Sequence, residues 1–223
     1  MDKISASLET IIAKVGDAAT KSGRNPSDIQ IVAASKTRSI ETLQAAFSTG
    51  KLTAFGENRV QEFLSKYSPE LPWDFIGQLQ TNKVKYLIGK VRLIHSVDRN
   101  RLAAEINRLA QKNGLVQKVL VEINSGAEEN KGGLPISEAK AFAHSLAEFP
   151  NLELKGIMAV APLNASKNKL HYLFRSVYEV YQSLQEFLPN VDTLSMGMSN
   201  DFETAIECGS NLVRLGRILF DSK

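Results

Sequence analysis

The chain has 223 residues, of which 43% are hydrophobic and 23% charged, so it is long enough to bury a globular core. Its 27 Lys and Arg against 24 Asp and Glu leave a net charge of +3, without the basic runs of a nucleic-acid-binding protein. A single cysteine, Cys208, excludes an internal disulfide or a cysteine metal cage. No apolar run reaches the roughly 20 residues that cross a membrane, and no signal peptide is evident. We therefore expect a cytoplasmic protein without a metal.

The first predicted element is an amphipathic helix over residues 2–22, which ends before Asn25-Pro26. Short apolar runs then alternate with segments of helical period. The predicted strands are 29–35, 53–56, 73–76, 91–95, 117–123, 152–158, 193–195 and 211–215. The predicted helices are 39–49, 57–66, 82–88, 100–112, 136–148, 170–187 and 201–207, with a final turn at 218–220.

Eight strand–helix units in this length predict one α/β domain over residues 1–223, a (β/α)8 TIM barrel with an extra N-terminal helix. The alternative is an open doubly wound sheet. That fold would place phosphate-binding glycines after the first strand, where this chain has Ser35-Lys36-Thr37. No linker rich in Pro, Gly or Ser divides the chain.

In a barrel, functional residues lie at the C-terminal ends of the strands. Lys36 directly follows the first strand. Partial desolvation there would favour the neutral amine, which condenses with an aldehyde to a Schiff base. On position alone, a solvated lysine at a strand end is the more frequent explanation. Of the other chemically active types, the three histidines are scattered without metal-ligand spacing, and Lys83, Lys85, Lys90 and Arg92 are predicted to form a solvated face.

Residues 195–199 follow the seventh strand and Gly216 follows the eighth, the two places where barrel enzymes frequently bind phosphate. Capping of the next helix by Ser199 or Asn200 is the alternative for the first loop. Arg214 lies two residues before Gly216 and therefore on the same side of its strand. Its guanidinium needs an acceptor, either a barrel carboxylate such as Glu122 or a ligand.

Several ordered strings resemble the YggS/PROSC family of pyridoxal 5′-phosphate homeostasis proteins from about residue 29 to residue 220: AASKTRSIETLQAAFSTG, FGENRVQE, DFIGQLQTNK, HSVD, KGIMAV and LSMGMSNDFETAIECGSNLVRLGRILF. The resemblance implies a barrel of the alanine racemase N-domain type (fold type III among pyridoxal phosphate proteins), with the cofactor as a Schiff base on Lys36. It also implies that Ser199 and the amides of Gly216 and Arg217 hold the phosphate. Arg214 would face the pyridine nitrogen, and Asn58 would line the cofactor's open side.

Lys131 matches a second family lysine that is suspected of helping cofactor transfer. The chain departs from the family pattern in two places. Asp74 stands where the family has His before FIG, and the sequence RLGRILFD brings Arg217 and Asp221 where the family has RIGTxIFG. Arg217 would either add a positive charge near the phosphate or point to solvent.

The resemblance implies a monomeric carrier that stores pyridoxal phosphate, delivers it to dependent apoenzymes and so affects amino-acid and keto-acid pools. Catalysis would need an acid or base on each face of the cofactor and closure against water. Alanine racemases obtain the second face from an added β-domain, and the chain runs only a few residues past the eighth strand. An arginine at the ring nitrogen also weakens the electron sink. The alternatives are a small pyridoxal-phosphate-dependent racemase or lyase, and an aldolase that uses Lys36 directly on a sugar phosphate.

Overall fold

Eight parallel strands close into a barrel in chain order in the computed structural model, which describes residues 3–126 and 132–221. Pairing of the last strand with the first leaves the sheet without a free edge. This confirms the predicted (β/α)8 fold and excludes the open sheet. The strands are β1 (Gln30–Ala34), β2 (Ala54–Glu57), β3 (Trp73–Phe75), β4 (Leu93–Val97), β5 (Gln117–Ile123), β6 (Leu152–Ala159), β7 (Thr193–Ser195) and β8 (Leu212–Leu215).

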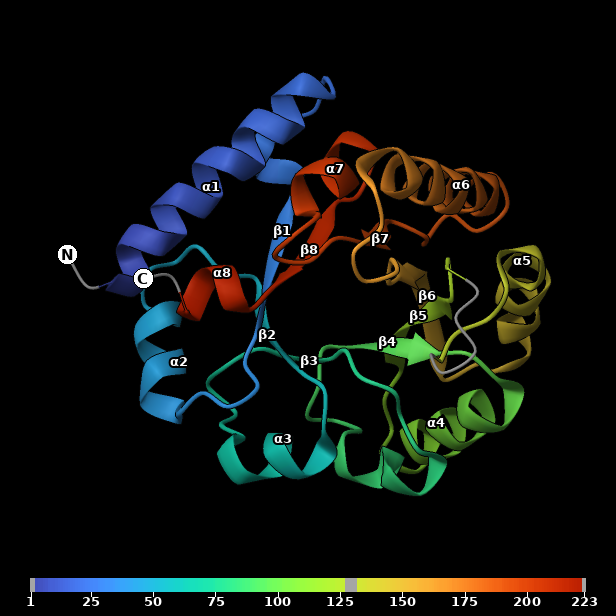
Figure 1. Cartoon of the computed structure of the whole chain (residues 1–223). Coiled ribbons are helices and arrows are strands. Elements are labelled where there is room, and N and C mark those ends of the chain that lie inside the picture. Colours follow the sequence, from blue (N-terminus) through green and yellow to red (C-terminus); the bar gives the residue numbers. More distant parts are fainter. Residues whose placement is uncertain (1–2, 127–131, 222–223) are drawn as a thin grey trace.

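Helices surround the barrel as an outer ring (Figure 1). No helix in the described ranges is long and apolar enough to cross a membrane. The helical segments are α1 (Lys3–Lys21), η1 (Pro26–Asp28), α2 (Ile40–Phe47), α3 (Val60–Lys66), η2 (Thr81–Tyr86), α4 (Asn100–Lys112), α5 (Ile136–Ser145), η3 (Leu146–Glu148), α6 (Lys167–Gln185), α7 (Phe202–Glu207) and α8 (Arg217–Phe220), where η denotes a 3₁₀ helix.

Three predicted boundaries are wrong for identifiable reasons. The predicted 82–88 helix is the 3₁₀ helix η2, whose bonds include Leu87 N–H to Val84 O at 2.9 Å. Strand β4 begins later than predicted and runs to Val97, with a register shift against β5 between Ile94 and Val97. Glu57, predicted to open a helix, is the buried last residue of β2 and pairs with β3.

The N-terminal helix α1 covers the outside of the barrel beside α7 and α8 (Figure 1). Helix α8 has only 4 residues and is too short to cover the strands next to it. Helix α1 supplies the missing apolar surface with Leu8 and Ile11, which are fully buried. Arg24, just beyond α1, donates to the carbonyls of Gly209 at 3.1 Å and Ser210 at 2.9 Å and so ties this helix to the end of α7.

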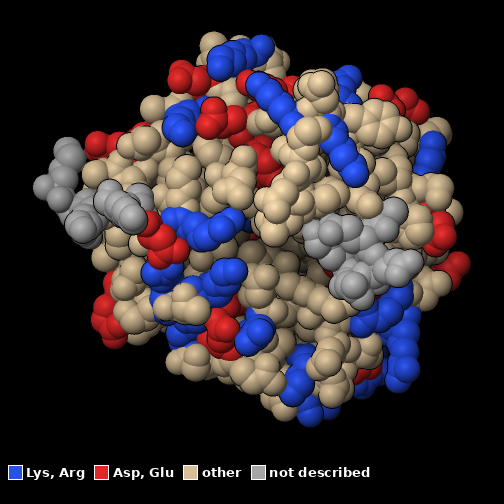
Figure 2. Space-filling model, viewed as in Figure 1, with Lys and Arg blue, Asp and Glu red and all other residues tan. Residues whose placement is uncertain are grey.

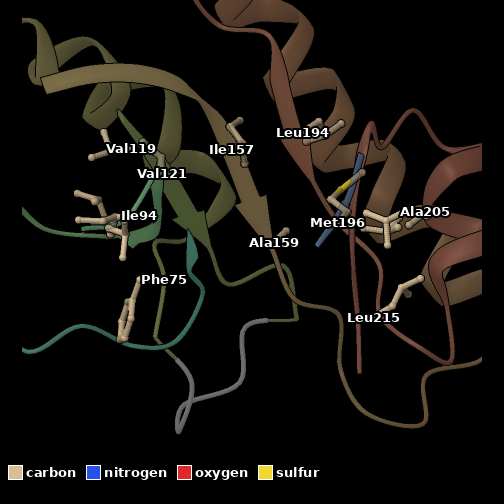
Figure 3. Packing of buried hydrophobic residues seen from close by; sticks show 14 of the residues in the cluster. Phe75, Ile94, Val119, Val121, Ile157, Ala159, Leu194, Met196, Ala205 and Leu215 are labelled. Carbon is tan, nitrogen blue, oxygen red and sulfur yellow. The ribbon is translucent and has the colours of Figure 1, made fainter. Parts of the chain in front are cut away.

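Side chains alternate between the two faces of each strand, so the barrel has an outer and an inner core. The outer core lies between strands and helices and includes Phe75, Ile94 and Leu194 (Figure 3). The inner core consists of Val32, Ala54, Leu93, Leu120, Met158 and Leu212. Two residues further along β4, β5 and β8, the inward positions carry His95, Glu122 and Arg214. The barrel interior therefore changes from apolar to polar toward its C-terminal mouth, where the functional residues are expected.

Candidate functional site

A cleft of about 480 Å³ opens at the C-terminal mouth of the barrel. Figure 2 shows a hollow near the centre of this face, with Lys and Arg side chains along its left edge. The cleft is lined by segments that follow β1, β6, β7 and β8. Of the predicted site residues, it brings together Lys36, Ser199, Arg214, Gly216 and Arg217.

Lys36 is exposed and makes no hydrogen bond or ion pair with any residue in the described ranges. Lys36 lies beyond Ala34, the last residue of β1, and lines the cleft, so the partial desolvation of its amine stays a prediction. The next residue, Thr37, has a φ of 63°, a left-handed conformation that is unfavourable for a β-branched residue. Lys36 therefore lies at the wall of the cleft, directly before a strained turn.

The backbone before Lys36 is held by a buried ion pair that the sequence analysis missed. Lys66 Nζ lies 2.6 Å from Glu57 Oε1 and donates to Ser35 O at 2.7 Å. The Ser35 hydroxyl donates to the same Glu57 oxygen at 2.7 Å. Both the carbonyl and the side chain of Ser35 are therefore fixed, so the free lysine projects from a rigid base.

Donors without partners gather on the side of the cleft formed by β7 and β8. The Ser199 hydroxyl accepts a hydrogen bond from Ile218 N–H at 3.3 Å, which leaves its own hydrogen available to an anion. Within the part of the chain that the structure describes, the amides of Gly216 and Arg217 donate no hydrogen bond, and the exposed Arg217 guanidinium has no partner. Helix α7 begins after Asp201 without a side-chain cap, so the capping alternative for Ser199 or Asn200 is wrong.

Arg214 is only 4% exposed, and the barrel itself supplies its acceptors. Its Nη1 donates to Ser195 O at 2.8 Å and also to Ser195 Oγ, while Nη2 donates to Ala159 O at 3.0 Å. No ion pair to Glu122 forms among the described residues, although the charges of Glu122 and Asp201 act on Arg214. Burial lowers the pKa of Arg214 to about 10, partly offset by these two carboxylates, so the side chain stays cationic at neutral pH.

Below Arg214 lies a buried polar chain that the sequence analysis did not assemble. His95 Nδ1 lies 3.1 Å from Ser195 Oγ, and His95 Nε2 lies 3.2 Å from Asp74 Oδ2. Arg92 donates to both oxygens of Asp74, from Nε at 3.0 Å and from Nη2 at 2.8 Å. Arg92 is therefore not part of a merely solvated face, as predicted, but neutralises a carboxylate inside the barrel.

Asn58 lies outside the main cleft, in a neighbouring one of about 180 Å³ that Gln78 and Glu122 also line. Its backbone packs directly on Gly77, where a Cβ atom would come within 2.2 Å of Asn58 O. This close approach explains why the FGEN and FIG motifs meet at a glycine. Glu122 Oε2 is buried here and has no hydrogen-bond partner among the residues that the structure describes. Burial, reinforced by Asp98, raises the pKa of Glu122 to about 7.

Two predicted residues remain, Asp221 and Lys131. Asp221 forms an ion pair with Arg38, whose guanidinium lies 5.3 Å from the centre of the Phe220 ring. This pair ties α8 to the segment after Lys36 and accounts for the unusual Asp221. Lys131 lies outside the described residues.

Comparisons with known proteins agree on the fold. The model of the alanine racemase N-terminal domain family matches residues 8–222. A pyridoxal phosphate homeostasis protein of Aquifex aeolicus is 43% identical over 97% of this chain and 96% of its own length. PipY of Synechococcus elongatus, in a structure with pyridoxal phosphate bound, has a TM-score of 0.79 at 29% identity and covers 92% of this chain and 99% of PipY. Alanine racemase of Clostridium difficile has a TM-score of 0.79 at 18% identity, over 96% of this chain and 59% of the racemase.

Glu122 gives a prediction for stability against pH. Its folded-state pKa of about 7 lies above the ordinary value of 4.5 for a glutamate, so the folded chain binds the additional proton and loses stability as the pH rises from about 4.5 to 7. We expect Glu122→Gln to stabilise the fold at pH 8 by on the order of 2 kcal/mol and to have little effect at pH 4.5. Urea unfolding at both pH values measures this, with exposed Glu148→Gln as the control. An equal effect of Glu122→Gln at both pH values would contradict it.

Proposed function

The chain belongs to the pyridoxal phosphate homeostasis protein family, whose fold is that of the alanine racemase N-terminal domain, and from this premise we propose that it binds, stores and delivers pyridoxal 5′-phosphate. One observation supports this most directly. One cleft holds an amine on Lys36, the buried cation Arg214, and an anion site made of a guanidinium, a hydroxyl and two amides. The amine, the guanidinium and the amides have no partner among the described residues. These groups fit a ligand that carries both an aldehyde and a phosphate. When bound, pyridoxal phosphate supplies the reactive aldehyde and an electron-withdrawing ring.

Each residue of the cleft has a role in this proposal. The Lys36 amine holds the aldehyde as a Schiff base. The Ser199 hydroxyl, the Gly216 and Arg217 amides and the Arg217 guanidinium hold the phosphate through charge-assisted hydrogen bonds. Arg214 presents a fixed positive charge to the ring nitrogen, which disfavours protonation of that nitrogen. Asn58 borders the open side of the ligand from the neighbouring cleft.

We propose a carrier because the cleft lacks an evident pair of proton-transfer groups. Among the described lining residues there is no Tyr, His or Cys, and Asp201 is the only carboxylate. Asp201 Oδ1 already accepts a hydrogen bond from Met198 N–H at 2.6 Å. A racemase or lyase would need an acid or base on each face of the ligand. An aldolase would need a proton relay beside Lys36, and no other lysine lines the cleft among the described residues. In this proposal the chain is a cytoplasmic, single-domain monomer, and pyridoxal-phosphate-dependent apoenzymes receive the cofactor.

The first prediction concerns Lys36. Purified protein mixed with pyridoxal phosphate gains a visible absorption band, and borohydride fixes one cofactor mass on the peptide that contains Lys36. Lys36→Ala loses both signals because it has no amine to form the imine. Lys112→Ala, an exposed lysine at the end of α4, is the matched control and keeps both. A wild-type protein that stays colourless with added cofactor, or an unchanged band in Lys36→Ala, would refute the proposal.

The second prediction separates the phosphate contacts from the rest of the site. Arg217→Ala and Ser199→Ala each weaken pyridoxal phosphate binding by about tenfold, since each removes a hydrogen bond to a charged group. The same variants bind pyridoxal, which lacks the phosphate, as tightly as the wild type does. Exposed Arg101→Ala is the control for a lost surface charge. Equal losses for the two ligands, measured by fluorescence titration, would argue against a phosphate site here.

The third prediction distinguishes carrier from catalyst. Loaded protein incubated with enantiopure alanine or serine leaves the amino acid unchanged over many equivalents, as chiral chromatography would record. The same loaded protein restores activity to a pyridoxal-phosphate-dependent apoenzyme, while Lys36→Ala adds nothing beyond the free cofactor present. Racemised or cleaved amino acid in excess of the protein would favour the enzyme alternative.

A further inference from the structure

We propose that His95 is a positioning residue for Arg214, acting through the Ser195 hydroxyl in a buried relay that Asp74 and Arg92 anchor. The inference rests on the proposed function, because Arg214 is the residue that faces the cofactor ring there. It assigns a role to a histidine and a carboxylate that do not line the cleft.

The relay crosses the inside of the barrel from strand to strand. It links Asp74 on β3, His95 on β4, Ser195 on β7 and Arg214 on β8. The first three residues are 0% exposed and Arg214 is 4% exposed, so no water competes strongly for these hydrogen bonds. Neighbouring links measure 3.2 Å from Asp74 to His95 and 3.1 Å from His95 to Ser195. Arg214 completes the chain by donating to the Ser195 hydroxyl oxygen.

The charges at the two ends decide where each proton sits. Although burial opposes it, hydrogen bonds from His95 and Arg92 lower the pKa of Asp74, so Asp74 is an acceptor only. Burial lowers the pKa of His95, with further lowering by Arg214 and Arg92 and opposition only from Asp74, so the ring is neutral. His95 must then carry its proton on Nε2 and donate it to Asp74.

The remaining link follows from this tautomer. His95 Nδ1 has a lone pair and can only accept, so the Ser195 O–H donates to it. The Ser195 oxygen is then left to accept from Arg214 Nη1. Each hydrogen bond of the relay therefore has a fixed donor, in the order Arg214, Ser195 and His95. A protonated His95 would instead direct a second donor at Ser195 and add a positive charge beside Arg214.

The relay adds the Ser195 hydroxyl to the two backbone acceptors of Arg214, Ser195 O and Ala159 O. It thereby completes the set of hydrogen bonds that orients the guanidinium. A fixed cation at the ring nitrogen acts through the conjugated ring on the imine. It disfavours the protonated form and keeps the pH midpoint of the cofactor absorption low. Removing one hydrogen bond of the relay should raise the pH midpoint of the cofactor absorption. The other charged groups that act on Arg214 are Glu122 and Asp201, which the tested variants leave in place.

The first arm of the experiment observes the histidine without any cofactor. The chain has 3 histidines, and His144 and His171 are exposed, so ¹⁵N NMR with His95→Gln as the assignment variant identifies the His95 ring. We expect the neutral Nε2–H tautomer from pH 6 to pH 8, and a mixed tautomer in Asp74→Asn because the carboxylate that selects it is gone. A charged ring or an Nδ1–H tautomer in the wild type would overturn the relay.

The second arm uses the loaded protein. Ser195→Ala and Asp74→Asn should each raise the pH midpoint of the cofactor absorption and weaken pyridoxal phosphate binding by about tenfold. In the double variant the effects should be far less than additive, since both changes break one chain. Ser195→Thr, which restores the hydroxyl, should return the midpoint toward the wild-type value. Ser96→Ala is the matched control, because Ser96 is a buried neighbour of His95 whose hydroxyl has no partner in the described part of the chain.

Two outcomes would contradict the inference while the proposed function stands. One is a wild-type midpoint and affinity in Ser195→Ala and Asp74→Asn, and the other is full additivity in the double variant. A wild-type chain that binds no pyridoxal phosphate would contradict the proposed function and the cofactor-facing role of Arg214 together. In that case the NMR arm still decides whether the relay exists.

Discussion

A guanidinium buried at the mouth of the barrel is the constraint on which the rest of the site depends. An isolated charge in an apolar interior is very costly, so Arg214 can occupy its place only if fixed acceptors surround it. The closed barrel provides them because β6, β7 and β8 follow one another around the sheet, which brings Ala159 O and Ser195 O to Arg214. The apolar layer below this level fills the remaining interior with side chains. Closure of the sheet thus positions a cation in a place that a more open sheet would leave to water.

Some polar groups around the cleft are hydrogen-bonded or ion-paired within the protein, and others have no partner in the described ranges. Ser35, Glu57 and Lys66 bind one another, and Arg214 binds the barrel, so these groups form rigid walls. Lys36 and Arg217 have no partner in the described ranges, although each stands next to a fixed element. Pre-organised walls with free donors at the rim bind an anionic aldehyde without the cost of rearranging the protein. This difference follows from burial, because a buried polar group needs a hydrogen-bond partner and an exposed one does not.

The sequence predicted the fold and the residues that meet at the cleft. It did not predict the hydrogen bonds among the polar residues inside the barrel. Alternation of apolar runs with helical periods indicates eight units, and barrel topology then brings Lys36 and Gly216 to the same end. The partners of Arg214 could not be predicted, since β7 has only 3 residues and its Ser195 has no local signal. Asp74, His95 and Arg92 are distant in sequence from Arg214 and meet only through barrel closure. Alternation along β4 offered one clue, because His95 follows the inward Leu93 by two residues.

The exposure of Lys36 bears on why a barrel of this kind suits storage. An enzyme that performs chemistry on a bound aldehyde gains from excluding water, which strengthens its electrostatics and suppresses side reactions. A carrier has the opposite requirement, since the imine bond must form and hydrolyse readily for the ligand to be loaded and released. Lys36 is exposed beside a cleft whose proposed phosphate site lies on a different pair of loops, after β7 and β8. In the proposed function, the phosphate site and Arg214 would retain the ligand, and water at the lysine would release it. The same separation explains why the buried relay is compatible with an open mouth: it fixes the cation from below and leaves the amine accessible from above.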